Sequence, residues 1–406
     1  MQKFEKHSPV VVTEVTTKHE LRQFMQYPNR LYADNPNYIP SFYGDDLSDW
    51  TPGKNPAFDY CEARCWLARR DGEIVGRIGA ILSHKANDKF GTHRMRFSQV
   101  DFVDDSEVSA ALFGTVERWA REKGCDQVHG PLGFTDMDRE GMLVEGFDRR
   151  SLFFTNYNAP YYLEHLTRLG YRKDVDWIEY RITVPEPGSA EAERLHKLSE
   201  FILKRKHLHV ATVHHKSEYG PFVRQVFELV NAAYAPLYGV VELSDEQIER
   251  YANKFIPLVD PDFVCFVVDE QDQLVAFGVT ALDPSVALKH SDGRLFPFGW
   301  AGVLNDLHHS DTLIMLLTAV RPDLQTEGIN AVMMDHVCQS CNRHGVRFAE
   351  TGPMLELNDH ILAQWKRLKK EQHKRRRCFI KDLDHDVNAA NAAAAQTETP
   401  ETESAE

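Results

Sequence analysis

The sequence predicts a mixed α/β protein in which two successive domains repeat one architecture. A chain of 406 residues is too long for one ordinary core and suits two domains of roughly 150–200 residues. Each half follows the order helix, hairpin, strand, helix, strand, helix, strand, although the two halves do not repeat in sequence. Pro185-Glu186-Pro187-Gly188 forms a turn-rich boundary between them. We therefore expect domains at residues 1–185 and 186–384, each a mixed central sheet flanked by helices.

Two local signals are strong in the first half. Asp71-Gly72 joins two apolar runs and predicts a hairpin turn. Residues 107–123 repeat apolar side chains at helical spacing and stop at Gly124, which predicts an amphipathic helix with a glycine end. The same reading predicts strands at 10–15, 65–70, 73–82, 96–103, from 127 onward and at 177–184, with helices at 18–32 and 160–169.

The second half repeats this order of elements. Residues 270–273 are polar and join two apolar runs, which predicts a second hairpin. Residues 312–320 form an apolar run that is long enough for a buried strand. The expected strands are at 209–214, 263–269, 274–281, 312–320, 348–351 and 376–382, and the expected helices at 190–206, 219–234, 245–255, 328–344 and 360–368.

Charge separates the folded part from the C-terminus. The chain has a formal net charge of −14, and six of its acids fall in the last 23 residues, which contain no Lys or Arg. The rest of the chain is therefore mildly acidic, which argues against a general nucleic-acid binder. Residues 385–406 are rich in Ala, Thr and Glu and are expected to be a disordered acidic tail.

Other sequence features narrow the classes of protein. The sequence contains no apolar run of about 18 residues and no signal-peptide pattern at its start, so we expect a cytoplasmic protein without a membrane span. Seven scattered cysteines do not suggest a disulfide framework. Cys338 and Cys341 form a CxxC inside an expected helix, with no second ligand pair, so packing is favoured and no metal is expected.

Residues 374–377 are all basic and form either a solvated strand face or a phosphate clamp.

The segment after the 312–320 strand has the character of a phosphate site. The strand ends at Val320, and a short loop with Gln325 and Gly328 leads into a helix near Asn330. Glycine at a helix N-terminus lets backbone N–H groups approach a ligand closely, and the helix dipole favours an anion there. The alternative is an ordinary turn between a strand and a helix.

This segment resembles the acyl-CoA loop of the GNAT acyltransferases, which reads (Gln/Arg)-x-x-Gly-x-(Gly/Ala). Gln325 and Gly328 match, whereas Asn330 is larger than the family's residue. The resemblance implies acetyl-CoA or another acyl-CoA as co-substrate, bound at Val320, Gln325, Gly328 and Asn330.

The resemblance extends to the next strand and helix. Asn358 matches a GNAT position, but Trp365 stands where the family has a tyrosine that protonates the CoA thiolate. An indole N–H does not titrate, so the acid must lie elsewhere. Glu350 and Glu356 lie near the place where the strands should separate, and a carboxylate there could accept a proton from an amine. We therefore take Glu350, Glu356 and Asn358 as candidate catalytic residues.

The first half lacks a comparable phosphate loop. Residues 104–107 read Asp-Asp-Ser-Glu, and acids at a helix N-terminus repel a pyrophosphate. It does contain a glycine- and aromatic-rich stretch over residues 130–162. Long irregular loops are often binding loops, although packing on its own aromatics would also explain the stretch. Our hypothesis is that this half recognises the acceptor through four side chains, those of Asn156, Asn158, Tyr161 and Tyr162.

Over nearly the whole chain except the tail, the sequence is similar to a bacterial family of tandem GNAT-like proteins described as N-acyltransferases. The matching segments include 35–40, 75–78, 130–131, 141–147, 158–162, 297–300, 350–358 and 374–381. The resemblance implies an acyl-CoA-dependent N-acyltransferase that acts on an amine of a small molecule or peptide. Two alternatives stay open: an aminoacyl-tRNA-dependent transferase, and a non-catalytic ligand-binding protein on the same scaffold.

Overall fold

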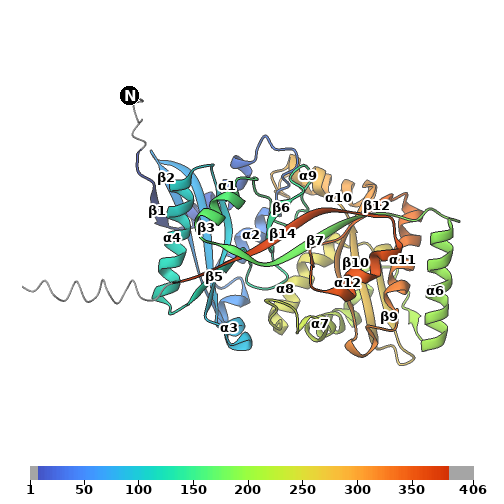
Figure 1. Cartoon of the computed structure of the whole chain (residues 1–406). Coiled ribbons are helices and arrows are strands. Elements are labelled where there is room, and N and C mark those ends of the chain that lie inside the picture. Colours follow the sequence, from blue (N-terminus) through green and yellow to red (C-terminus); the bar gives the residue numbers. More distant parts are fainter. Residues whose placement is uncertain (1–7, 384–406) are drawn as a thin grey trace, which may run out of the picture.

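The computed structural model describes residues 8–383, which form one continuous mixed β-sheet with helices on both faces (Figure 1). Residues 1–7 and the predicted tail at 385–406 lie outside this range. The predicted α/β class with two GNAT-like halves is confirmed. The hairpin at Asp71-Gly72 is present, and both turn residues have the positive φ (51° and 85°) that this tight turn requires.

The elements of the first half are the strands β1 (Val11–Glu14), β2 (Cys61–Arg70), β3 (Glu73–Ser83), β4 (Arg94–Phe102), β5 (Gln127–Gly130), β6 (Met142–Glu145) and β7 (Arg172–Thr183), and the helices α1 (Lys18–Leu31), α2 (Tyr43–Asp49), α3 (His84–Phe90), α4 (Ser106–Glu122) and α5 (Tyr162–Arg168). Those of the second half are the strands β8 (His209–Val210), β9 (Val264–Val268), β10 (Leu274–Leu282), β11 (Thr312–Val320), β12 (Phe348–Glu350), β13 (Met354–Leu355) and β14 (Lys370–Asp382), and the helices α6 (Ala190–Lys206), α7 (Gly220–Tyr234), α8 (Asp245–Phe255), α9 (Ser285–His290), α10 (Gly299–His309), α11 (Asn330–His344) and α12 (Asp359–Ala363).

The described strands follow the order β1-β2-β3-β4-β5-β14-β7-β12-β11-β10-β9-β8, with β6 beside β14 and β13 beside β7. Among these strands, two neighbouring pairs are parallel, β4 with β5 and β11 with β12. Each half therefore contains one parallel pair within an otherwise antiparallel sheet. This arrangement places two similar strand-to-helix connections in the molecule, β4 to α4 and β11 to α11.

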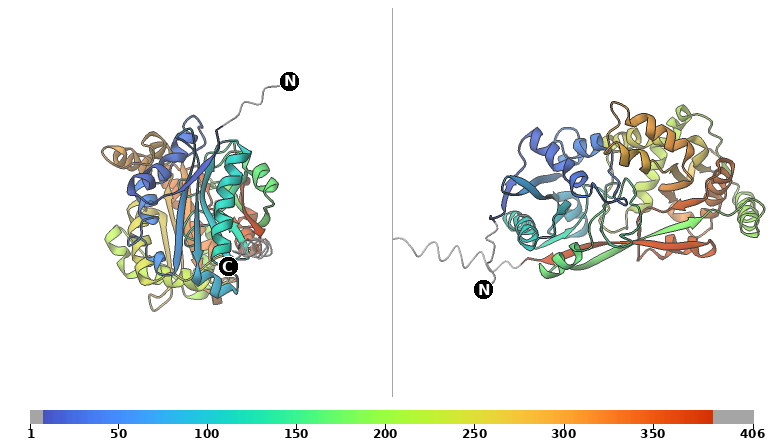
Figure 2. Two further views of the ribbon diagram at one scale, coloured as in Figure 1. Left: turned by 90° about the vertical axis from the view of Figure 1, so that its left-hand side faces the viewer. Right: turned by 90° about the horizontal axis from the view of Figure 1, so that it is seen from above.

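The two halves exchange strands at the centre of the sheet. β14, the last strand of the chain, lies beside β5 of the first half, and β7 lies beside β12 of the second half (Figure 2, right). β7 and β14 also pair with each other along most of their length. The predicted boundary at residues 185–186 falls in the connection from β7 to α6, but the sheet does not divide there. Each half thus needs a strand from the other to complete its sheet.

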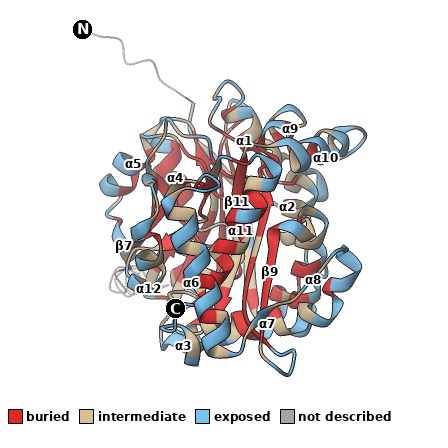
Figure 3. Cartoon of the chain, turned by 90° about the vertical axis from the view of Figure 1, so that its right-hand side faces the viewer, coloured by how far each residue is buried: buried red, intermediate tan, exposed pale blue. Residues whose placement is uncertain are grey.

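Helices cover both faces of each half. In the first half, α1 and α2 pack on one face, and α4 and α5 contribute to a separate core. In the second half, α7 and α8 share a core with β9 and β10, whereas α11 packs with α6 on the other side. β9 and β11 are mainly buried, and the outer faces of α6, α7 and α8 are exposed (Figure 3). Within residues 8–383, no helix has the length and apolar character that crossing a membrane requires.

A helical hairpin occupies the connection from β10 to β11, where the sequence analysis assigned no element. α9 and α10 pack against each other, and their inner side chains join Ile39, Phe42, Leu152 and Phe153 of the first half in one core. The corresponding connection from β3 to β4 is much shorter and contains only the short helix α3. The hairpin is therefore a specific addition to the second half.

Candidate functional site

The parallel strands of the second half separate soon after they begin. β11 and β12 pair from Thr312–Phe348 to Ile314–Glu350, after which β11 continues to Val320 with β10 as its sole strand neighbour. A register shift between Val279 and Thr280 leaves Leu316 as an extra residue on β11, which is a β-bulge. The sequence predicted a buried strand here, but residues 315–318 are only half-buried. One edge of β11 therefore has no strand beside it over residues 315–320 among the described residues.

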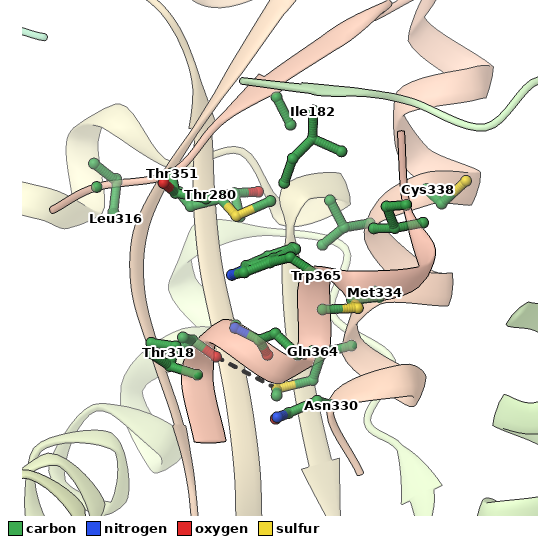
Figure 4. Close-up of a pocket in the computed structure, with 18 of the residues that line it drawn as sticks. Ile182, Thr280, Leu316, Thr318, Asn330, Met334, Cys338, Thr351, Gln364 and Trp365 are labelled. Atoms are coloured by element: carbon green, nitrogen blue, oxygen red, sulfur yellow. Dashed lines mark hydrogen bonds between the residues drawn. The ribbon is translucent and has the colours of Figure 1, made fainter. Parts of the chain in front are cut away.

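This free edge borders an apolar cavity of the second half, about 170 Å³ in volume. In Figure 4, Trp365 and Gln364 lie on one side of it, and Met334, Cys338 and Asn330 of α11 lie on the other. Thr318 Oγ1 approaches Met333 Sδ to 3.9 Å across its floor. Most of the remaining lining is hydrocarbon or sulfur, from strands β7, β10 and β11. We call this cavity the slot.

The N-terminus of α11 lies at one end of the slot, because Asn330 both begins the helix and lines the cavity. The preceding residue makes no side-chain capping bond, and the first turn contains no acid. Gly328 has φ +80° and is exposed, and the Gln325 side chain donates to the carbonyl oxygen of Val320 at 3.3 Å. The four predicted CoA-binding residues are thus brought together beside an uncapped helix N-terminus, which suits an anion.

The corresponding helix of the first half satisfies its own N-terminus. Asp105 caps α4 by accepting from the backbone N–H groups of Glu107 and Val108, and it also pairs with Arg70 at 2.5 Å. The dipole of α4 is therefore already matched by a carboxylate. This contact agrees with the expectation that the acids at 104–107 exclude a pyrophosphate from the first half.

Tyrosine side chains close the free edge of β4, which separates from β5 after Arg96. The Phe102 N–H donates to the Tyr162 hydroxyl at 2.7 Å, and the Tyr161 hydroxyl donates to the Phe102 carbonyl at 2.5 Å. Tyr162 is completely buried and also bonds to Tyr32. The sequence analysis proposed that both tyrosines contact the acceptor, but the structure uses them to cover strand β4.

The two predicted asparagines hold the same loop. Asn158 is buried, and its amide accepts from the Leu143 N–H at 2.7 Å and donates to the Leu143 carbonyl at 3.0 Å. Asn156 donates to the Gly141 carbonyl at 3.0 Å and remains partly exposed beside a small cavity of about 30 Å³. These bonds give Asn158 a packing role. Of the four predicted side chains, Asn156 and Tyr161 are partly exposed, and Asn156 borders this cavity.

The predicted carboxylates do not point into the slot. Ala349 and Thr351 line it, so the intervening Glu350 faces the opposite side of β12, where it lies 3.3 Å from Lys374 Nζ. Glu356 pairs with Lys173 and with Arg375. Asn358 caps α12 by accepting from the Ile361 N–H. These contacts account for all three residues without a substrate, because each has a partner in the fold.

The basic run on β14 is neither a solvated face nor a phosphate clamp. Lys374 and Arg376 are fully buried and pair with Glu179, whereas Arg375 and Arg377 on the other face pair with Asp176. Burial alone would raise the pKa of Glu179, but the charges of Arg376 and Lys374 hold it below its usual value. The run therefore ties β14 to β7 at the point where the halves exchange strands.

Two carboxylates in the first half's glycine-rich loop were not singled out from the sequence. Burial raises the pKa of Asp136 to about 6, and the charge of Asp138 adds to this shift. Burial also raises the pKa of Glu140 well above its usual value, and the charge of Asp136 adds to that shift. Burial raises the pKa of Tyr234, and the negative charge of Asp136 raises it further. The Tyr234 hydroxyl lines the slot and donates to the Thr318 carbonyl at 2.7 Å. The sequence marked this loop, but an Asp in a glycine-rich turn is usually a turn residue, so no local signal identified Asp136.

A second apolar cavity, of about 70 Å³, lies beneath α7 and α8. It shares Val279, Leu316 and Leu317 with the slot, so the two cavities meet at the bulge of β11. Its lining contains no charged residue. Met137, next to Asp136, packs in the same cluster of side chains. The loop of the first half therefore contributes a side chain to the core of the second half.

His129, Asp174 and Cys378 form a group whose ligand atoms lie within 4.8 Å of one another. The Tyr238 hydroxyl lies among them, 2.9 Å from His129 Nδ1, 2.5 Å from Asp174 and 3.5 Å from Cys378 Sγ. Hydrogen bonding to this phenol explains the group, and it fastens the loop after α7 to three adjacent strands.

Comparison with known proteins supports the fold assignment. No family model matches the chain. A tandem GNAT protein from the clavulanic acid biosynthesis pathway superposes with a TM-score of 0.52 at 13% identity, covering 92% of this chain and 99% of that one. A GCN5-related N-acetyltransferase from Sphaerobacter thermophilus gives a TM-score of 0.50 at 12% identity, covering 92% and 96%. The chain therefore has the tandem GNAT fold.

Two curated proteins are similar in sequence. Protein YghO of Escherichia coli K12 is 27% identical over 379 residues, which cover 92% of this chain and 95% of that protein. The bacterial ceramide synthase of Caulobacter vibrioides NA1000 is 28% identical over 300 residues, which cover 72% of this chain and 75% of that protein.

Proposed function

We propose that the protein is an acyl-CoA-dependent N-acyltransferase whose second half binds the acyl donor. The observation that carries this proposal is the free edge of β11 at residues 315–318, which faces an apolar slot that ends at an uncapped helix N-terminus. A pantetheine arm has amide groups that bond to an unpaired strand edge, and a pyrophosphate suits a helix N-terminus. The first half lacks both features, because tyrosines cover β4 and Asp105 caps α4.

The donor's phosphates would lie at Gly328 and Asn330. Gly328 is exposed with positive φ, so the backbone N–H groups that follow it can approach a ligand without a side chain between them. Lys206 of α6 lies beside this loop, where it pairs with Glu327 at 2.7 Å. This lysine would supply a cation next to the phosphates.

The acyl chain would pass the β11 bulge and enter the cavity beneath α7 and α8. That cavity is lined by side chains such as Val226, Phe227 and Phe255, without a charged group. Each buried methylene contributes about 0.8 kcal/mol, so an apolar cavity favours longer acyl chains over acetyl. We therefore expect affinity for acyl-CoA to rise with chain length.

The reaction would be a direct transfer. Asp136 takes a proton from the ammonium form of the acceptor, and the free amine attacks the thioester carbon. The new C–N bond forms and the C–S bond breaks, the CoA thiolate takes a proton from Tyr234, and the Tyr234 phenolate regains a proton from the nitrogen of the new amide. Tyr234 is the one tyrosine among the described residues that line the slot, and its raised pKa keeps it protonated. We propose Tyr234 as the general acid, because the indole of Trp365 cannot serve as one.

The acceptor class is proposed from the curated relative. A ceramide is the amide of a fatty acid with a long-chain amino alcohol, so a ceramide synthase forms an amide on a lipid amine. Two connected apolar cavities fit a reaction in which hydrocarbon chains must be buried. We propose a long-chain acyl-CoA as donor and a lipid amine as acceptor. The acidic net charge of −14 still disfavours an aminoacyl-tRNA donor.

Calorimetric titration with long-chain acyl-CoA tests this proposal. We expect Gly328→Glu to weaken binding at least about tenfold, which corresponds to about 1.4 kcal/mol, and Gly328→Gln to weaken it less, because only Glu adds a charge beside the phosphates. Gly53→Glu is the matched control, because Gly53 has a similar φ of +78° and nothing lies within 4 Å of an added Cβ. Equal affinity in Gly328→Glu and wild type would refute the assigned phosphate site. Binding without turnover on any amine would favour the non-catalytic alternative.

A further inference from the structure

The helical hairpin α9–α10 exposes an unusual set of apolar side chains. Phe296 and Phe298 are 80% and 81% exposed, and Trp300 of α10 is 48% exposed. Val286 on α9 and Leu304 on α10 are also exposed. These five, which we call the aromatic patch, are five of the eleven large apolar side chains that are exposed within residues 8–383, and they fall within 19 consecutive residues. Clustering of this kind marks an interaction surface.

The aromatic patch is held outward by a well-packed base. Leu288 and Val303 of the same hairpin are buried in the core that joins the two halves. Trp300 and Leu304 are one helical turn apart and share the outer face of α10. Residues 295–305 contain no charged side chain, although 27% of the whole chain is charged. The hairpin therefore presents an uncharged, aromatic tip on a rigid support.

Basic residues border this tip. Arg294 is exposed two residues before Phe296, and His308 and His309 end α10, whereas Lys289 of α9 is turned inward and donates to the Asn35 carbonyl at 2.7 Å. Of the hairpin's two acids, Asp292 is exposed and Asp306 is turned inward to accept from the Ala287 N–H at 2.7 Å. Aromatic side chains beside basic ones are the composition that binds at the headgroup layer of a bilayer.

The patch is continuous with a groove that enters the molecule. Arg294, Leu295 and Phe296 form part of the rim of a groove of about 970 Å³ between the halves. This groove shares Asp45 and Lys254 with an inner cavity of about 100 Å³, which is lined by Met137, the neighbour of Asp136. A route therefore leads from the aromatic patch toward the loop that we propose supplies the base.

We infer that the α9–α10 hairpin docks on the surface of an anionic phospholipid bilayer, with Phe296, Phe298 and Trp300 entering the interfacial layer. The protein would then take its lipid amine from the bilayer through the groove. This last step rests on the proposed function, whereas bilayer binding itself does not. The chain would lie on the membrane, as expected for a protein whose described helices do not cross it.

Co-sedimentation with vesicles of equal parts phosphatidylglycerol and phosphatidylcholine tests the docking. We expect the wild-type chain to bind and the double variant Phe296→Ser/Phe298→Ser to lose at least about tenfold in partition, because two apolar rings no longer enter the bilayer. Both side chains are almost fully exposed, so the double variant should fold normally. Phe201→Ser on α6 is the matched control, since Phe201 is 56% exposed outside the hairpin and should not affect binding.

Trp300 supplies a second, local measurement. The other five tryptophans are at most 6% exposed, so quenching by brominated phospholipid reports on Trp300 alone. We expect its emission to shift to the blue and to be quenched with vesicles, and Trp300→Phe to lose the signal while still sedimenting.

Three results would overturn the inference: no vesicle binding by the wild type, equal binding by the double variant, or a dimer that the double variant dissociates. Acyl transfer to a water-soluble amine separates this inference from the proposed function. If the double variant keeps that transfer but loses vesicle binding, both proposals stand. If the wild type binds vesicles but transfers no acyl group, the proposed function fails and the docking remains.

Discussion

Asp136→Asn is predicted to make the protein more stable and less active at the same time. Burial raises the pKa of this carboxyl from 3.8 to about 6. Each pKa unit corresponds to 1.36 kcal/mol, so the ionised Asp136 destabilises the folded state by up to about 3 kcal/mol at neutral pH. The side chain is partly exposed, and solvent screening lowers our expectation to about 1–3 kcal/mol.

The pH dependence follows from the sign of this shift. The folded state holds the proton more tightly than the unfolded state, so the wild type gains stability from Asp136 below its unfolded pKa of 3.8 and loses that advantage as the pH rises through about 6. Asparagine does not ionise. We therefore expect the variant and the wild type to differ little at about pH 4, and the stability gain of the variant to be complete above about pH 6.

Urea unfolding at several pH values measures the stability gain, and initial rates with acyl-CoA and amine measure the loss of activity. Removing a general base typically costs 10²–10⁴-fold, and the wild-type rate should fall below about pH 6 as Asp136 is protonated. Asp148→Asn is the control, because that side chain is 81% exposed and should change neither quantity. A variant that is no more stable than wild type above pH 6 would refute the assigned burial. Full activity would refute the assigned base.

Three further predictions concern other parts of the molecule. Lys374→Met should lower the free energy of unfolding by about 3–5 kcal/mol in urea titrations, because it leaves the buried Glu350 without its lysine and Glu179 with Arg376 alone. Lys173→Met at a 40% exposed pair should cost under about 1 kcal/mol, and equal losses would contradict the buried network. Asn158→Ala should lower the melting temperature by removing two hydrogen bonds to Leu143 and leave kcat per folded molecule unchanged; a changed acceptor KM would instead restore its predicted role in binding. Tyr234→Phe should reduce kcat while calorimetry shows unchanged acyl-CoA affinity, and an unchanged kcat would exclude Tyr234 as the acid.

The division of labour between the halves follows from a difference at two equivalent positions. Both halves contain a parallel strand pair that separates, followed by a helix. In the first half, Tyr161 and Tyr162 satisfy the free strand edge and Asp105 satisfies the helix, so little is left to attract a ligand. In the second half, Tyr234 bonds to the Thr318 carbonyl alone, and α11 has neither a side-chain cap nor an acid in its first turn. Unsatisfied backbone groups beside a cavity are the physical reason to place the donor there.

The sequence by itself determined the local features of this protein. Apolar spacing located α4, the Asp71-Gly72 turn located the β2–β3 hairpin, and Gly328 marked the strand-to-helix turn before α11, because each signal acts within one or two turns of chain. The acids at 104–107 likewise indicated a self-capped helix, since a cap needs only residues that are near in sequence.

Only the tertiary structure decided how distant segments combine. The exchange of β7 and β14 joins the halves, and it buries Lys374 and Arg376, because strands adopt partners by position in the sheet and not by order in the chain. The same packing gave Glu350 a cation, used Tyr162 to cover β4, and let the charge of Asp136 help raise the pKa of Tyr234. A side chain's charge state and accessibility depend on neighbours that lie far away in the sequence, 197 residues for Arg376 and Glu179, and a local pattern carries no information about them.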